Sequence, residues 1–127
     1  MPIVLCRVDD RLVHGQVAAA LVEAVEQISG ITGALTPVSN TDCDRGSLEQ
    51  KIEAAIDDHP AVIFVDLASG SCLFAALHRL KVHPDVRVVT GVNLAMLLDF
   101  VFHRDQTAEA AAGRAREVGE RAIRVPA

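Results

Sequence analysis

The segment Ala61-Val62-Ile63-Phe64-Val65, followed at once by Asp66, decides the fold class. Five consecutive apolar residues, rich in β-branched side chains, predict a short strand that is buried on both faces. Such strands are typical of parallel sheets that carry helices on both sides, because the crossover helices cover the sheet. We therefore expect an α/β protein.

The rest of the chain alternates between strand and helix patterns. Further strands are predicted at 3–8, at 34–38 (a weak segment that Pro37 places at a sheet edge), at 86–90 and, as a final short strand, at 122–125. Amphipathic or capped helices are predicted at 16–28, 46–57, 71–80, from Asn93 to 101, and from Thr107 to 118. This order predicts one doubly wound domain, residues 1–127, with a mostly parallel sheet of four or five strands and helices on both faces.

Composition limits the class of protein. Half of the 127 residues are hydrophobic but only 3% are aromatic, so the core is expected to be aliphatic, and a domain of this size needs no metal or disulfide to fold. No apolar run approaches the roughly 18 residues of a membrane-spanning helix, and MPIVLCRVDDR lacks the features of a signal peptide. Three cysteines without CxxC spacing favour a reducing, cytoplasmic compartment and disfavour a zinc site, and a net charge of −5 disfavours nucleic acid as a partner.

The predicted topology selects a small set of candidate site residues. In doubly wound sheets the functional crevice lies beyond the carboxyl ends of the strands. The polar side chains that follow the predicted strands at this edge are Asp9, Asp10, Arg11, His14, Asp66, Ser69, Ser71 and residues 90–93. A histidine, carboxylates, hydroxyls and an amide are therefore expected to meet at one rim.

This set of residues suits phosphoryl transfer. His14 is a nucleophile when its imidazole is neutral, and Gly15 leaves room for a bulky group at the start of the following helix, whose N–H groups favour phosphate. Arg11 and Ser71 offer donors to phosphate oxygens, and Asp66 offers an acceptor that would fix the tautomer of His14. The spacing of these residues is also compatible with purely structural roles. A histidine in a polar loop is more often only solvated, and a carboxylate placed like that of Asp66 is as often a helix cap. Arg11 is equally suited to form an ion pair with a neighbouring carboxylate.

Two kinds of resemblance favour the phosphoryl-transfer interpretation. The segment Arg7-Val8-Asp9-Asp10-Arg11-Leu12-Val13-His14-Gly15-Gln16 resembles the R-I-D-D-R-L-I-H-G-Q phosphorylation loop of enzyme IIB in mannose/sorbose-type sugar phosphotransferase systems (PTS). Over nearly the whole chain, however, the sequence resembles the IIA component of those systems. Three segments show this resemblance to IIA. The first is His14-Gly15 before a helix, and the second is the strand 62–67, which leads into a turn written D-L-F-G-G-S-P in the family. The third is 90–98, which is similar to the family signature G-V-N-[IL]-P-M-L.

The resemblance to IIA implies a function. IIA components of this type are α/β domains, usually homodimers that can exchange a C-terminal strand, and they need no cofactor or metal. They accept a phosphoryl group from the phosphocarrier HPr on a histidine and pass it to a histidine-bearing IIB component. Carried over to this sequence, the phosphoacceptor is His14, the orienting carboxylate is Asp66, and the phosphate-binding residues are Arg11, Gly15 and Ser71.

The sequence also departs from the family pattern. Residues 68–72 read Ala-Ser-Gly-Ser-Cys in place of F-G-G-S-P, and Ala95 replaces the proline of the second signature. Because the altered turn lies where a partner would dock, other functions stay open. They are a regulatory phospho-switch without sugar transport, a IIA-like subunit of a dihydroxyacetone kinase, and an α/β domain that binds a partner without chemistry.

Overall fold

Four strands and four helices make up the described part of the chain. The structure, a computed structural model, describes residues 3–6, 16–38, 45–66, 77–78, 81 and 83–127. In chain order these elements are β1 (Ile3–Cys6), α1 (Gln16–Ser29), β2 (Leu35–Val38), α2 (Arg45–Ile56), β3 (Ala61–Val65), β4 (Val86–Thr90), α4 (Leu94–Val101) and α5 (Ala108–Arg121). Each lies within a few residues of a predicted element. The predicted helix at 71–80 falls largely outside the described residues.

The strands form one parallel sheet in the order β2-β1-β3-β4. The two central positions belong to β1 and β3, and all five residues of β3 are buried, as its unbroken apolar sequence predicts. β2 lies at an edge, where Pro37 costs no ladder hydrogen bond on the outer side. The predicted α/β class with a parallel sheet is therefore confirmed.

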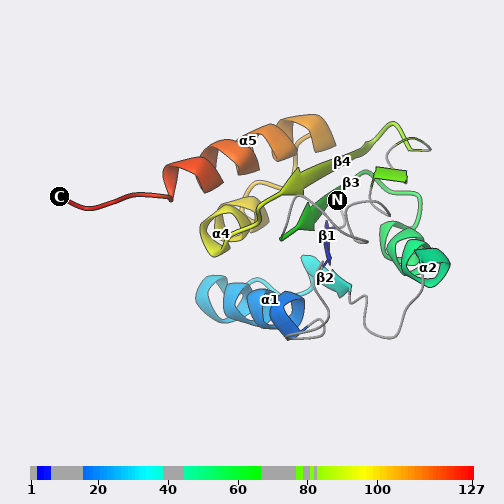
Figure 1. Ribbon diagram of the computed structural model, residues 1–127, viewed down its shortest axis with the longest axis horizontal. Coiled ribbons are helices and arrows are strands. Elements are labelled where there is room, and N and C mark those ends of the chain that lie inside the picture. The colour runs from blue at the N-terminus through cyan, green and yellow to red at the C-terminus, as the bar shows by residue number, and fades with distance from the viewer. Residues whose placement is uncertain (1–2, 7–15, 39–44, 67–76, 79–80, 82) are drawn as a thin grey trace.

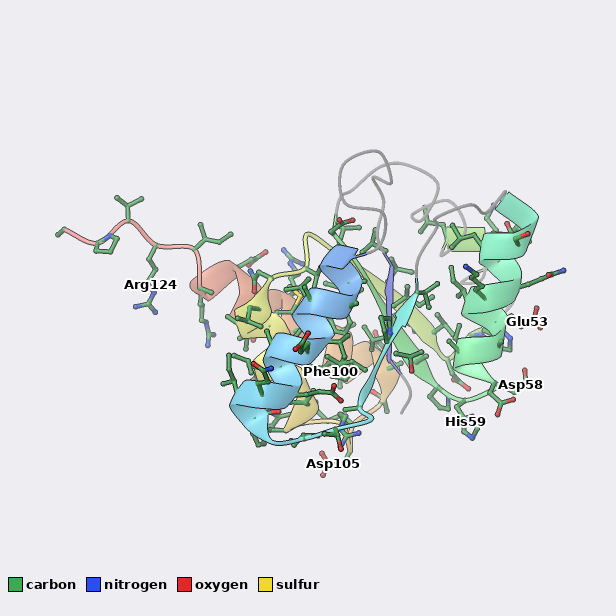
Figure 2. The ribbon with its side chains drawn as sticks, turned by 90° about the horizontal axis from the view of Figure 1, so that it is seen from below. Glu53, Asp58, His59, Phe100, Asp105 and Arg124 are labelled. Carbon is green, nitrogen blue, oxygen red and sulfur yellow. The ribbon has the colours of Figure 1, made fainter. Side chains whose placement is uncertain are left out.

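The two faces of the sheet bury different helices. Because side chains alternate along a strand, Val62 and Phe64 face one way, and Ala61, Ile63 and Val65 face the other. The first face packs against α1, α4 and α5, and the second packs against α2. Figure 2 shows α1 and α2 on opposite sides of the strands.

The described core is largely aliphatic, as composition predicts, with one aromatic pair. The rings of Phe64 on β3 and Phe100 on α4 meet edge to face, with centroids 5.1 Å apart and an interplanar angle of 88°. This geometry is the favourable one for two aromatic quadrupoles. It fixes α4 against the centre of the sheet.

Helices α4 and α5 begin at the residues that the sequence predicts. Asn93 caps α4, since its side chain accepts from the backbone N–H of Met96 (3.0 Å), and Thr107 caps α5 by accepting from Ala110 (3.1 Å). The two helices pack against each other and are joined by a bidentate pair in which Nε and Nη2 of Arg114 donate to Asp99 (2.7 and 3.0 Å). Hydrogen bonding from Arg114 holds the pKa of the Asp99 carboxyl below its ordinary value, against the smaller opposing effect of burial.

The predicted strand at 122–125 is wrong. Helix α5 runs three residues further than predicted, to Arg121, and residues 123–127 then form an exposed tail without regular secondary structure. Figure 1 shows this tail leading away from the body of the molecule, past the end of α5. A strand needs a neighbouring strand for its hydrogen bonds, and the tail has none among the described residues of its own chain. We call residues 123–127 the C-terminal tail.

Within the described residues, no helix is long and apolar enough to cross a membrane.

Candidate functional site at the carboxyl edge of the sheet

All four strands end level with one another at the same edge. The backbone register pairs Cys6 with Val38 and with Val65, and Val65 with Thr90. Because the strands are parallel, the four chain segments that leave them start side by side. The segment after Cys6, which carries His14 in the sequence, therefore begins next to the strand end from which Asp66 emerges. The structure thus places the starting points of the predicted site together.

Among the predicted catalytic and phosphate-binding residues, the structure describes Asp66. It follows the last residue of β3 directly and is partly buried. The peptide unit that joins it to Val65 is held from the neighbouring segment, because the backbone N–H of Val92 donates to the carbonyl oxygen of Val65 (3.2 Å). This bond fixes the plane of the peptide unit and hence the direction in which Asp66 leaves the strand.

The remaining predicted site residues lie outside the described residues: His14, Arg11, Gly15 and Ser71. Helix α1 begins at Gln16, two positions after His14, which agrees with the predicted helix start. In the part of the chain that the structure describes, no group of three His, Cys, Asp or Glu side chains is arranged to hold a metal ion.

A groove lies beside Asn93 and the end of β4. It has a volume of about 450 Å³ and is lined by residues of β4, α4 and α5, with Ile123 of the C-terminal tail at its margin. Its polar lining includes Thr90, Asn93 and Arg116. Since β4 is an edge strand of the described sheet, the groove runs along a strand whose outer side pairs with no other described strand.

Asn93 makes a second contact that sequence analysis missed. While its Oδ1 caps α4, its Nδ2 donates to the carbonyl oxygen of Gly119 in the last turn of α5 (3.1 Å). The capping role can be predicted from the local sequence, since Asn93 stands three residues before Met96, whose N–H it accepts. The bond to Gly119 spans 26 residues and has no such signal. One side chain therefore links the loop after β4 to the C-terminal helix.

The sequence matches a known family over most of its length. Residues 12–116 match the family model for the PTS system fructose IIA component. The IIB-like segment, residues 7–16, begins before the matched range and overlaps its first five residues. The chain is also 34% identical over 92 residues to the PTS system sorbose-specific EIIA component of Klebsiella pneumoniae, which covers 69% of this chain and 67% of that protein.

Solved structures share the fold. The mannose/sorbose-specific IIA subunit of the phosphotransferase system from Enterococcus faecalis superimposes with a TM-score of 0.85 over 99% of this chain and 94% of its own, at 22% identity. The phosphotransferase system component EIIA from Streptococcus agalactiae gives the same TM-score at 15% identity, over 98% of this chain and 95% of its own. The match to this family model and to the sorbose-specific relative places this chain in the family of PTS IIA components of the mannose/sorbose type.

Proposed function

We propose that this IIA component carries a phosphoryl group on His14 and that Asp66 orients the imidazole. The supporting observation is the register of β1 and β3, since Cys6 pairs with Val65 and the segment that carries His14 starts beside Asp66. A carboxylate that accepts from one ring N–H leaves the other ring nitrogen with its lone pair exposed. We further propose that residues 1–127 form one domain of this type, located in the cytoplasm.

The chemistry is one nucleophilic displacement at phosphorus. The lone pair of the free ring nitrogen of His14 forms the new N–P bond, and the bond between phosphorus and its donor atom breaks with the electron pair leaving on the donor. The remaining ring N–H of His14 donates to Asp66 throughout, so no proton has to leave the site. Arg11, Gly15 and Ser71 are proposed to hold the phosphoryl oxygens, because transfer depends chiefly on positioning and charge stabilisation.

The partners that we propose are those implied by the family. HPr donates the phosphoryl group, and a IIB component accepts it from His14. Neither step requires a cofactor, a metal or contact with the sugar.

We also propose a homodimer in which the C-terminal tails are exchanged. Ile123 and Val125 are 79% and 96% exposed on a tail that leaves the body of the molecule, which is an unfavourable place for aliphatic side chains. The outer edge of β4 and the adjoining groove offer backbone hydrogen bonds and apolar surface to the tail of a second copy.

The role of Asp66 is tested by Asp66→Asn in single-turnover transfer from phosphorylated HPr. The amide cannot accept as a carboxylate does, so we expect transfer to slow by about 10²-fold, the lower end of what a positioned acid–base partner contributes. Asp85→Asn is the matched control, because Asp85 is exposed and lies just before β4, at the opposite edge of the sheet. Equal rates for Asp66→Asn and the wild type would refute the orienting role.

A further inference from the structure

Asn93 connects the rim beside Asp66 to the last turn of α5. On one side is the rim, where Val92, the residue before Asn93, donates its N–H to the peptide unit that carries Asp66. On the other side is the last turn of α5, where Nδ2 of Asn93 donates to Gly119. The C-terminal tail starts four residues after Gly119.

The contact between Asn93 and Gly119 is closely packed. Gly119 is buried, and a Cβ built on it would overlap the Cε of Met96, whose side chain is 3% exposed. Nδ2 of Asn93 lies 3.5 Å from the same Cβ position. The last turn of α5 therefore rests directly on the first turn of α4, with little room to slide.

Asn93 thereby ties the end of the loop after β4 to two helices. Its Oδ1 accepts from Met96 and holds the start of α4, and its Nδ2 holds α5, so a shift of α5 is transmitted to the residue next to Val92. A shift of Val92 rotates the peptide unit between Val65 and Asp66, since that unit accepts the N–H of Val92. Rotation of this unit turns the Asp66 side chain.

We propose that Asn93 is a positioning residue that sets the orientation of the Asp66 carboxylate through the contact between α5 and the rim. The inference rests on the proposed function, because it takes Asp66 as the partner of His14. It adds a residue that touches neither the phosphoryl group nor the histidine, and a route by which the position of the C-terminal helix reaches the site.

Asn93→Ser separates the two roles of this residue without changing the charge. Serine is a good N-cap and keeps an acceptor for the N–H of Met96, but it has no amide donor for Gly119. The matched control is Thr107→Ala, which removes the cap of α5 at the end of that helix remote from Gly119. A second variant, Gly119→Ala, disturbs the same contact from α5 and has Gly113→Ala as its control, because a Cβ at Gly113 meets nothing within 4 Å.

The readouts are the imidazole pKa of His14, measured by NMR titration of the full-length unphosphorylated protein, and the rate of phosphoryl uptake from HPr. Asp66→Asn provides the reference, and it is expected to lower the pKa of His14 because a carboxylate next to an imidazole favours its protonated form. Asn93→Ser is expected to lower the pKa of His14 in the same direction and to slow uptake by about 2- to 30-fold, the range for residues that act through a neighbour. Thr107→Ala is expected to leave both unchanged.

The outcomes distinguish this inference from the proposed function. If Asp66→Asn moves the pKa of His14 but Asn93→Ser and Gly119→Ala do not, the positioning role is wrong and the proposed function stands. If Asp66→Asn leaves that pKa unchanged, the pairing of Asp66 with His14 is wrong and this inference fails with it. If Thr107→Ala changes the pKa of His14 and the rate of uptake as much as Asn93→Ser does, a general loosening of α5 explains both effects, and the inference is also overturned.

Discussion

Two residues, one near each end of α4, join this helix to α5. At its start, Asn93 caps the helix and reaches α5. Towards its end, Asp99 accepts two hydrogen bonds from Arg114 and so joins α4 to α5 a second time. Asp99 is also the described carboxylate whose pKa is shifted, and the shift makes this second contact depend on pH.

The contribution of Asp99 to stability should disappear in acid. Its folded-state pKa lies below the ordinary value of 3.8, so the unfolded chain binds the proton more readily than the folded one. Its stabilising effect is therefore fully present above about pH 3.8 and is lost as the pH falls through the lower folded value. We expect Asp99→Asn to lower the urea midpoint at pH 7 and to match the wild type increasingly well below pH 3.8.

The measurement is urea unfolding of Asp99→Asn and the wild type across this pH range, with Asp105→Asn as the control. Asp105 lies in the connection between α4 and α5 and is exposed, so its substitution should have little effect at any pH. A difference between Asp99→Asn and the wild type that grows in acid would contradict the assigned cause.

At the scale of elements, the packing of α5 on α4 depends on a glycine. Most residues of α5 that face the core are small, namely Ala108, Ala111, Ala115 and Gly119, which lets the helix approach closely. Gly119 is the tightest of these positions because Met96 fills the space where its Cβ would be. Gly113 lies on the same helix with open space around it.

These two glycines should respond differently to the same substitution. Alanine raises helix propensity by about 1 kcal/mol at either position, so Gly113→Ala should increase the free energy of unfolding by about 0.5–1 kcal/mol. At Gly119 the added methyl group must displace the Cε of Met96, the far end of a flexible but buried side chain, so we expect this gain to be reduced or cancelled there. Denaturant unfolding of both variants checks this, and equal stabilisation by both would contradict the described contact between α4 and α5.

The strands and helices could be predicted from the sequence where the signal is local. The apolar run of β3, Pro37 at the sheet edge, and the caps Asn93 and Thr107 each depend on neighbouring residues, and each is confirmed. The contact of Asn93 with Gly119 could not be predicted, because it depends on how α5 returns to the sheet. The predicted strand at 122–125 was wrong because an apolar pattern does not show whether a neighbouring strand is available to pair with it.

The strand ends that border the candidate site could be predicted for a related reason. In a parallel sheet the carboxyl ends of strands meet, so Asp66 and the segment after Cys6 could be placed at one edge from strand order alone. The register of β1 and β3 confirms this for the strand ends. The functional assignments of His14, Arg11, Gly15 and Ser71 stay predictions.

At the scale of the whole molecule, the C-terminal tail and the outer edge of β4 are complementary. Residues 123–127 carry exposed Ile123 and Val125 two positions apart, which would share one face of a strand. The groove beside β4 presents apolar side chains of β4 and α5. In the proposed dimer, a second copy of the chain would supply to each a partner that the described residues of its own chain do not supply.

Replacing both aliphatic residues of the tail should therefore dissociate the proposed dimer. We expect the wild type to have about twice its chain mass of 13.5 kDa in light scattering, and the variant with Ile123→Asp and Val125→Asp to have the mass of one chain. Arg124→Gln is the control, because Arg124 would face the opposite side of such a strand. A monomeric wild type, or a double variant that stays dimeric, would contradict the exchange.

Whether His14 carries the phosphoryl group is decided by the intact mass of the protein after incubation with phosphoenolpyruvate, enzyme I and HPr. We expect one acid-labile phosphoryl increment on the wild type and on His103→Ala, because His103 lies after α4, at the opposite end of that helix from its cap Asn93. We expect no increment on His14→Ala. An increment that persists in His14→Ala, or a folded wild type that gains none while HPr is fully phosphorylated, would contradict the proposed role of His14.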